Sequence, residues 1–377
     1  MAQAEPSKYE LDAWQKLEQH NGKPLSAAFR DVNDRVVKGA VALGQKTSAY
    51  VEEHPGAGNV ANRGKAAVTK SAKAVGAVVG KVGDAIPAGV TEWTGAALDS
   101  AKTTAARASR AGLSAKRVVD LHKKKGHGVD ELTDVRRLDL KQVDKVGRRG
   151  TQLYYPGLAA LSGAGTALVI SGGQIATVAS GGAAAAPSTG MVLGAVAVDA
   201  TAILTLATRA VGHVALLYGY DPEDPNEKIF ALSVVNAGTA ISATAKTAAF
   251  ADVSRLTQAL VRGKTWEVLN KSVVSKVTGQ FAKAFGVRLT KKSLGKFVPI
   301  VGIVLGGTFN WATLEGIFDA AYVAYRRRFL AEKYPQLLAE RPVKLHVVNA
   351  GPDEADEPIS VLDELAEAGG PDLRNDA

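Results

Sequence analysis

Residues 209–232, RAVGHVALLYGYDPEDPNEKIFAL, decide the fold, because they join the end of one apolar helix to the start of another. The apolar spacing that leads into this stretch predicts a helix over residues 190–218. In the turn that follows, Asp224 suits an N-cap, Pro225 suits the first helical position, and Glu227 stands where a capping-box acid is found. The stretch therefore predicts a tight turn between two helices.

Helical spacing continues on both sides of this turn. Upstream, residues 150–198 contain no charged residue and are dominated by Gly and Ala, with small-residue pairs such as Gly190 and Gly194 that allow helix backbones to approach closely. Downstream, Phe281 and Phe285 share one helical face with two valines before them. The predicted helices beside 190–218 cover residues 156–181, 225–262, 263–296 and 297–314. The fold class is therefore all-α, a multi-helix bundle with a Gly/Ala-rich, closely packed central hairpin.

Composition divides the chain into four regions. The first is polar, the second is a basic, Ala-rich helical region, the third contains the predicted helical bundle, and the fourth is short, acidic and predicted to be largely disordered. These regions cover residues 1–60, 61–125, 130–335 and 345–377.

Charge is unevenly distributed along the 377 residues. The formal net charge of +9 combines +17 over residues 1–350 with −8 over residues 351–377. Such a basic body suits a polyanionic partner, and an anionic membrane surface or lipid is the expected one. The acidic tail can compete for the same basic surface, so its removal is expected to increase binding.

A basic amphipathic helix is predicted within residues 263–296. Its cations combined with a Phe stripe are typical of a helix that lies on a membrane surface, although the same stripe also suits ordinary core packing. The cations predicted to face the membrane are Lys276, Lys283, Arg288, Lys291, Lys292 and Lys296.

A first group of candidate site residues lies on the helix 190–218 and in the turn after it. Asp199, Arg209 and His213 fall near one helical face, and they are followed by Tyr218, Tyr220 and Asp221. One interpretation is that these groups form buried ion pairs that connect helices. The other is that they line a cavity, as the site of an enzyme, of a small-molecule-binding protein or of a lipid head group.

A second group comprises Asn310, Glu315 and Asp319. The two acids are one helical turn apart, a spacing that suits two carboxylates acting at one site, but also suits solvated or ion-paired acids. The acids at 221, 223 and 224 are explained by turn chemistry, so no metal site is predicted.

Several function classes are disfavoured. With no Cys, the chain has no thiol nucleophile and no thiolate metal site. It contains no HExxH, GxSxG or EF-hand motif and no dinucleotide fingerprint, so no cofactor is expected. The basic stretches lack interleaved aromatic residues, so no specific nucleic-acid partner is expected.

The order of these residues resembles the EcsC family of bacterial proteins. The resemblance rests on Asp199, Arg209, His213, the YGYD turn at 218–221 and the Glu227-x-x-Phe230-Ala231-Leu232 segment. It continues downstream through Pro299, Gly302, Gly306, Asn310, Tyr325 and Arg326. It covers about residues 130–335, and the region before residue 120 and the acidic tail lie outside it.

The resemblance implies an all-helical, intracellular, membrane-associated bacterial protein. The first 14 residues contain acids and no apolar run, so no secretory signal is predicted. The function expected is that of a non-enzymatic, peripheral membrane or lipid-binding protein. It would act at the inner face of the cell membrane, beside a membrane transport system or another membrane protein. Two alternatives remain: the enzyme or ligand-binding site described above, and an integral membrane protein that inserts residues 156–218 and 297–314.

Overall fold

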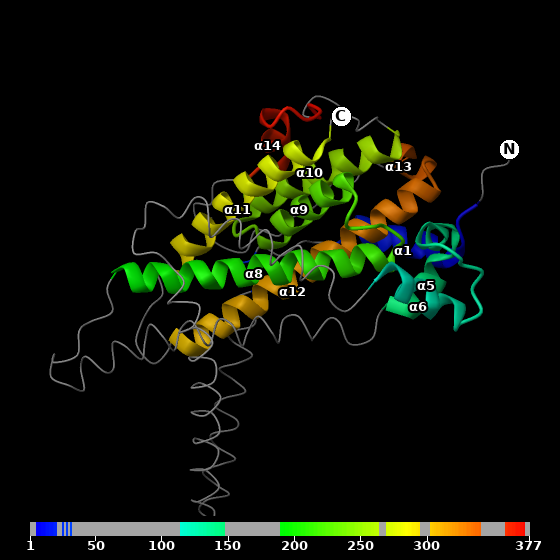
Figure 1. Ribbon diagram of the computed structural model, residues 1–377. Coiled ribbons are helices and arrows are strands. Elements are labelled where there is room, and N and C mark those ends of the chain that lie inside the picture. The colour runs from blue at the N-terminus through cyan, green and yellow to red at the C-terminus, as the bar shows by residue number, and fades with distance from the viewer. Residues whose placement is uncertain are drawn as a thin grey trace, which may run out of the picture.

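The computed structural model describes residues 5–20, 25, 28, 31, 114–147, 189–263, 269–294, 302–340 and 359–373. Side chains are described over the same ranges except at 147, 189–202, 289–294, 302–309 and 339–340. Within these ranges every regular element is a helix, which confirms the all-α fold class (Figure 1). The predicted helix 156–181 and most of the basic region 61–125 lie outside the described residues.

The described elements follow one another as ten α-helices and one 3-10 helix. Their bounds are α1 Lys8–Glu18, α5 Ala115–Lys123, η3 Leu132–Arg137, α6 Leu140–Gly147, α8 Thr189–Leu217, α9 Pro225–Thr239, α10 Ala243–Val261, α11 Lys271–Leu294, α12 Gly302–Lys333, α13 Gln336–Glu340 and α14 Val361–Glu367.

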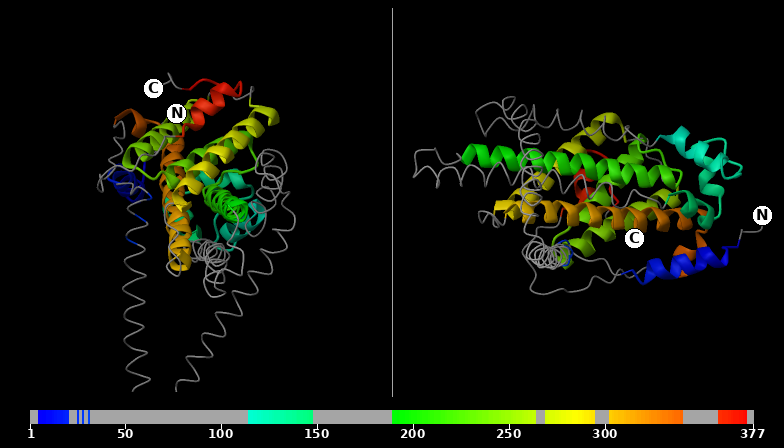
Figure 2. Two further views of the ribbon diagram at one scale, coloured as in Figure 1. Left: turned by 90° about the vertical axis from the view of Figure 1, so that its left-hand side faces the viewer. Right: turned by 90° about the horizontal axis from the view of Figure 1, so that it is seen from below.

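Two long helices, α8 and α12, pack against each other through the molecule and cross obliquely, as the left panel of Figure 2 shows. The helix α9 packs along α12, and α10 and α11 pack against α9. At one end of this bundle, α1 contacts both α12 and α6, while α5 and η3 contact each other. The buried side chains of all these helices form one continuous apolar core. Among the described residues, no helix combines the length and the hydropathy needed to cross a membrane.

The start of α9 agrees with the sequence, but its end does not. The helix begins at Pro225 after Asp224, as predicted. The predicted single helix 225–262 is instead two helices, because the chain turns at Ala240–Ser242 and the Ser242 side chain accepts a hydrogen bond from the backbone N–H of Ala245. Serine is a preferred N-cap residue, so Ser242 was a signal for a new helix. It was overlooked because the apolar periodicity continues across it.

A pair of glycines sets the distance between α9 and α12. A Cβ at Gly238 would lie 2.5 Å from the Cα of Ile317, and one at Gly316 would lie 2.9 Å from the backbone oxygen of Gly238. The two helices therefore touch through their backbones at this crossing. The pairs that the sequence indicated, at 190/194 and at 302/306, lie where side-chain surroundings are not described.

The Phe stripe of α11 is core, in agreement with the structural interpretation of its pattern. Phe281 and Phe285 are fully buried, with ring centroids 5.9 Å apart, and Val277 beside them is equally buried. The apolar side of α11 therefore faces the bundle, and its other side faces outward.

The prediction of a largely disordered tail is wrong for its described part. Residues 361–367 form α14, which packs on α11 and α9. Val361, Leu362 and Leu365 are fully buried there. Three apolar side chains at helical spacing outweigh the acidic composition of the surrounding sequence.

Candidate functional site

Arg328, on α12, is the centre of a buried ionic cluster at the end of α8. Its Nη1 lies 2.6 Å from Oε1 of Glu227 on α9, and its Nε donates to Oε1 of Glu332 at 2.7 Å. The side chains of Arg328 and Glu227 are 5% and 4% exposed. Burial alone would lower the pKa of Arg328, but the two carboxylates and Tyr220 raise it, so the guanidinium stays charged.

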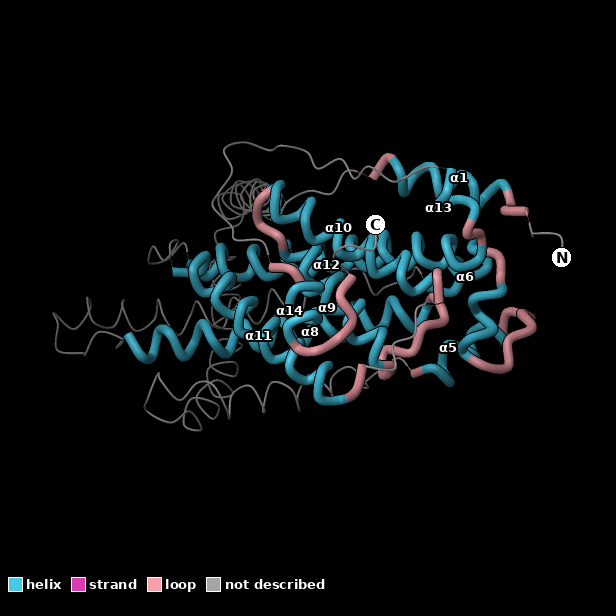
Figure 3. Tube along the Cα trace, turned by 90° about the horizontal axis from the view of Figure 1, so that it is seen from above, coloured by secondary structure: helices cyan, strands magenta, loops and turns pink. Residues whose placement is uncertain are grey.

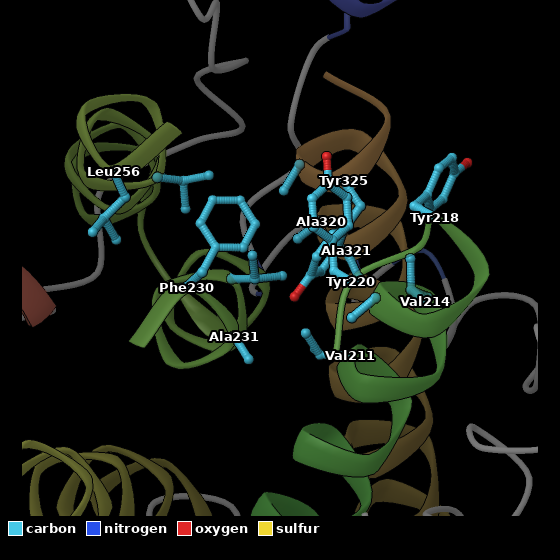
Figure 4. Packing of buried hydrophobic residues seen from close by; sticks show 14 of the residues in the cluster. Val211, Val214, Tyr218, Tyr220, Phe230, Ala231, Leu256, Ala320, Ala321 and Tyr325 are labelled. Atoms are coloured by element: carbon cyan, nitrogen blue, oxygen red, sulfur yellow. The ribbon is translucent and has the colours of Figure 1, made fainter. Parts of the chain in front are cut away.

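Two tyrosines complete the ionic cluster. Tyr220 donates its hydroxyl to Oε2 of Glu332 at 3.1 Å, and Tyr325 donates to Oε2 of Glu227 at 3.3 Å. The Arg328 guanidinium also lies over the Tyr220 ring, 4.1 Å from its centroid. Figure 4 shows the Tyr220 and Tyr325 rings close together beside Phe230. Burial and the adjacent carboxylates raise the pKa of both tyrosines, which keeps them protonated donors.

Gly219 allows the turn to present Tyr218 and Tyr220 in opposite directions. Its φ is +86°, and a Cβ there would lie 3.0 Å from the backbone oxygen of Leu132 in η3. Tyr218 donates to Oδ1 of Asp144 at 3.2 Å. Thus the two tyrosines of the YGYD turn bind two different carboxylates on different elements.

Asp144, on α6, is a second point of connection. Its Oδ2 accepts hydrogen bonds from the Tyr9 hydroxyl at 2.7 Å and from Nη2 of Arg326 at 2.8 Å. The N-terminal helix α1 is connected in the same way, because Glu10 accepts from Lys333 Nζ and from the Tyr334 hydroxyl, both at 2.8 Å. Burial would raise the pKa of Glu10, but Lys333 and the other donors lower it.

These contacts show that both tyrosines of the YGYD turn donate hydrogen bonds to carboxylates within the protein. Every carboxylate oxygen of Glu227, Glu332 and Asp144 has a partner within the protein. Asp221 is exposed and accepts from the backbone N–H of Glu223 at 2.9 Å, a local turn contact. Tyr218, Tyr220 and Asp221 therefore do not converge on one site.

The polar face of α8 includes a buried histidine. His213 is 7% exposed, and burial together with the charges of Arg209 and Arg117 lowers its pKa to about 4. Asp199 is on the same helix, where its side chain is not described. The charge of Arg209 thus acts on His213, one helical turn away on α8.

The low pKa of His213 predicts acid sensitivity. The ordinary pKa of histidine is 6.5, so between pH 6.5 and about 4 His213 is protonated in the unfolded chain but neutral in the folded protein. The free energy of unfolding therefore falls as the pH drops below 6.5. Between pH 6.5 and 4.5 this histidine is expected to account for a loss of about 2 kcal/mol. Urea unfolding at both pH values should show this loss reduced by that amount in His213→Gln.

His122 provides the internal comparison for this measurement. It is fully buried, and burial with the charges of His127 and Lys125 lowers its pKa to about 4 as well. Because His122 remains in the variant, the pH dependence should shrink and not vanish. An unchanged loss of stability in His213→Gln would contradict the assignment.

The second group from the sequence lies on α12. Asp319 lies 3.2 Å from Nε2 of His20, which comes from the segment after α1. Glu315 is exposed, whereas Asn310 is 2% exposed. Both acids are exposed, and the contact of Asp319 with His20 agrees with the interpretation of a solvated or ion-paired acid. In the part of the chain that the structure describes, no three metal-ligating side chains cluster to hold an ion.

The basic residues assigned to a membrane-facing surface divide into two sets. Lys276 and Lys283 are exposed on α11, as expected. Arg288 is 6% exposed and donates to Oδ1 of Asn236 at 3.0 Å, so its assignment to the membrane-facing set is wrong. Its neighbours at 291 and 292 have undescribed side chains, and Lys296 lies outside the described residues.

Comparison with known proteins supports the resemblance. The model of the EcsC protein family matches residues 61–330. The chain belongs to the EcsC protein family. The EcsC match starts at residue 61 and so includes the basic Ala-rich region, which the sequence reading had placed outside it.

A curated relative is also similar over part of its length. It is the uncharacterized protein YdbA of Bacillus subtilis (strain 168), 27% identical over 139 residues. The aligned part is 36% of this EcsC family chain and 48% of YdbA, so the chain spans about half the length of that relative. No solved structure matches the chain.

The residues matched by the family model include the Arg328–Glu227 pair but not the two terminal helices. Arg328 and Glu227 fall inside residues 61–330, whereas α1 and α14 fall outside. Sequence reasoning missed the Arg328–Glu227 pair because Glu227 was assigned to a capping box and Arg328 was given no role. One sequence signal was present: Glu332 lies four residues after Arg328, a spacing that predicts an ion pair on one helical face.

Proposed function

We propose that this EcsC family protein is a non-enzymatic, peripheral binder of anionic membrane surfaces, and that the outward side of α11 makes the contact. It would act at the inner face of the cell membrane, beside a membrane transport protein. The observation that supports the proposal is the exposed side of α11, which carries Lys276 and Lys283.

The outward side of α11 has the chemistry of a membrane-surface helix. The helix contains six Lys and Arg residues and no Asp or Glu. Lys276 and Lys283 are exposed about two turns apart, and Val287, one turn further, is an unusually exposed apolar residue at 52%. Lysines that share a helical face with an exposed apolar side chain favour contact with anionic head groups and the acyl boundary below them.

The buried ionic cluster is a poor candidate for the active site that the enzyme alternative requires. A general acid, base or nucleophile needs a position within hydrogen-bond reach of a substrate. The carboxylates of Glu227 and Glu332 are instead bound by Arg328 and tyrosine hydroxyls. These groups serve to hold α8, α9 and α12 together, and the exposed surface is the more suitable place to look for activity.

Vesicle binding tests the proposal directly. Full-length protein should co-sediment with vesicles that contain phosphatidylserine, less so as salt increases, and little with phosphatidylcholine alone. Each lysine near an anionic surface contributes about 1 kcal/mol, so Lys276→Gln combined with Lys283→Gln should weaken binding about 30-fold.

The matched control removes the same charge elsewhere. Lys16 on α1 and Lys141 on α6 are also exposed, and replacing both with Gln should change binding far less. Binding that is equal on neutral and anionic vesicles, or equal losses in the two double variants, would contradict a role for α11.

A further inference from the structure

We infer that residues 359–373 form a releasable cover over α9 and α11, and that release uncovers apolar surface with which the protein enters an anionic lipid surface. This inference rests on the proposed function, which it deepens by naming the step that regulates binding. It also identifies the segment of the chain that competes with lipid.

The cover is held by a small apolar contact. The helix α14 lies over α9 and α11, as Figure 3 shows from above. Three side chains of α14 itself are fully buried on its inner face: Val361, Leu362 and Leu365. After the helix, Leu373 is 1% exposed. With seven residues α14 is too short to be stable as an isolated helix, so its structure depends on docking. Removing the cover would expose the apolar surface of α9 and α11 that these side chains contact.

Three polar contacts fix the start of the cover. Asn236 on α9 donates its side-chain N–H to the backbone oxygen of Ile359 at 2.5 Å, and Ser360 donates to Oδ2 of Asp252 on α10 at 2.8 Å. The buried Arg288 of α11 holds Asn236 in place through its Oδ1. Arg288, the described cation of α11 that turns inward, therefore supports the docked tail.

Like charges oppose the docking. Burial and the adjacent Asp363 raise the pKa of Asp252, and burial with Glu367 and Asp363 raises the pKa of Glu364. Asp252 of α10 therefore repels Asp363 of the cover, whereas Glu364 is repelled by acids of the cover itself. Residues 359–373 contain four acids and no Lys or Arg, so an anionic membrane that approaches α11 repels the cover. We therefore infer that lipid and the cover compete for the apolar surface of α9 and α11 that lies under α14.

The absence of Cys from the chain allows a direct test with single introduced thiols. Leu365→Cys places a thiol beneath the cover, and Ala368→Cys does so with a smaller change of side chain. In the full-length chain both thiols should react slowly with maleimide in buffer or with phosphatidylcholine vesicles. With phosphatidylserine vesicles their rates should increase at least tenfold.

Two further thiols serve as controls. Glu367→Cys, on the exposed side of α14, should react rapidly under all conditions, while Ala210→Cys, in the core of α8, should stay protected and so exclude general unfolding. Co-sedimentation is measured on the same samples.

The outcomes separate the two proposals. Protein that binds anionic vesicles while both cover thiols stay protected overturns the cover and leaves the proposed function intact. Cover thiols that react as rapidly as Glu367→Cys in buffer also overturn it, because the segment is then not docked. Protein that does not bind anionic vesicles overturns the proposed function itself.

Discussion

Replacing Arg328 with methionine is expected to destabilise the protein by about 3–5 kcal/mol, the usual cost of removing one partner of a buried ion pair. Methionine fills much of the arginine volume, so the loss is electrostatic and not mainly a cavity. Glu227, 3% exposed, would keep its Tyr325 contact and lose its cation. Glu332 would lose the Nε donor at the same time. Urea unfolding at pH 7 measures the difference.

A matched substitution and a change of pH identify the cause. Arg137→Met removes an arginine that is 84% exposed and paired with Asp134, and it should cost less than about 1 kcal/mol. Burial already raises the pKa of Glu227, and the loss of Arg328 raises it further. A carboxyl with a raised folded pKa is more stable protonated, so the deficit of Arg328→Met should shrink as pH falls from 7 to 5. A deficit no larger than that of Arg137→Met would disprove the central role of this pair.

The turn at 218–225 shows how far local sequence rules reach. Pro225 begins α9 and the helix before the turn ends at Leu217, both close to prediction, because caps and prolines act within a few residues. The partner of Glu227 was not predictable in this way. Arg328 is about a hundred residues away, and only the packing of α12 on α9 brings the two together.

It is equally difficult to predict from the sequence which cations of a single helix are exposed and which are buried. Lys283 and Arg288 have the same formal charge in sequence, yet Lys283 is exposed and Arg288 is buried against Asn236. The side of α11 on which each lies follows from its periodicity, but whether the inward side meets a hydrogen-bond acceptor depends on α9. The docking of α14 was missed for a related reason, since acidic composition hid three apolar residues that have a buried surface to contact.

Replacing Gly238 with alanine is expected to cost about 3 kcal/mol or more, because the new Cβ would meet backbone. It would lie 2.5 Å from the Cα of Ile317 and 3.0 Å from its backbone nitrogen, so α9 and α12 would have to separate. Overpacking of a core typically costs 1–3 kcal/mol where side chains can adjust, and here none can. The gain in helix propensity from Gly to Ala, about 1 kcal/mol, offsets only part of this loss. Thermal or urea unfolding measures the net effect.

Gly279→Ala on α11 is the matched control, because a Cβ there meets nothing within 4 Å. With no clash, the same substitution should stabilise the protein by about 0.5–1 kcal/mol, so the two variants should shift stability in opposite directions. Ile317→Ala should not rescue Gly238→Ala, since trimming that side chain removes the Cγ1 contact and leaves the Cα and nitrogen in place. Rescue, or equal effects of the two glycine substitutions, would show that α9 and α12 are not in backbone contact at this crossing.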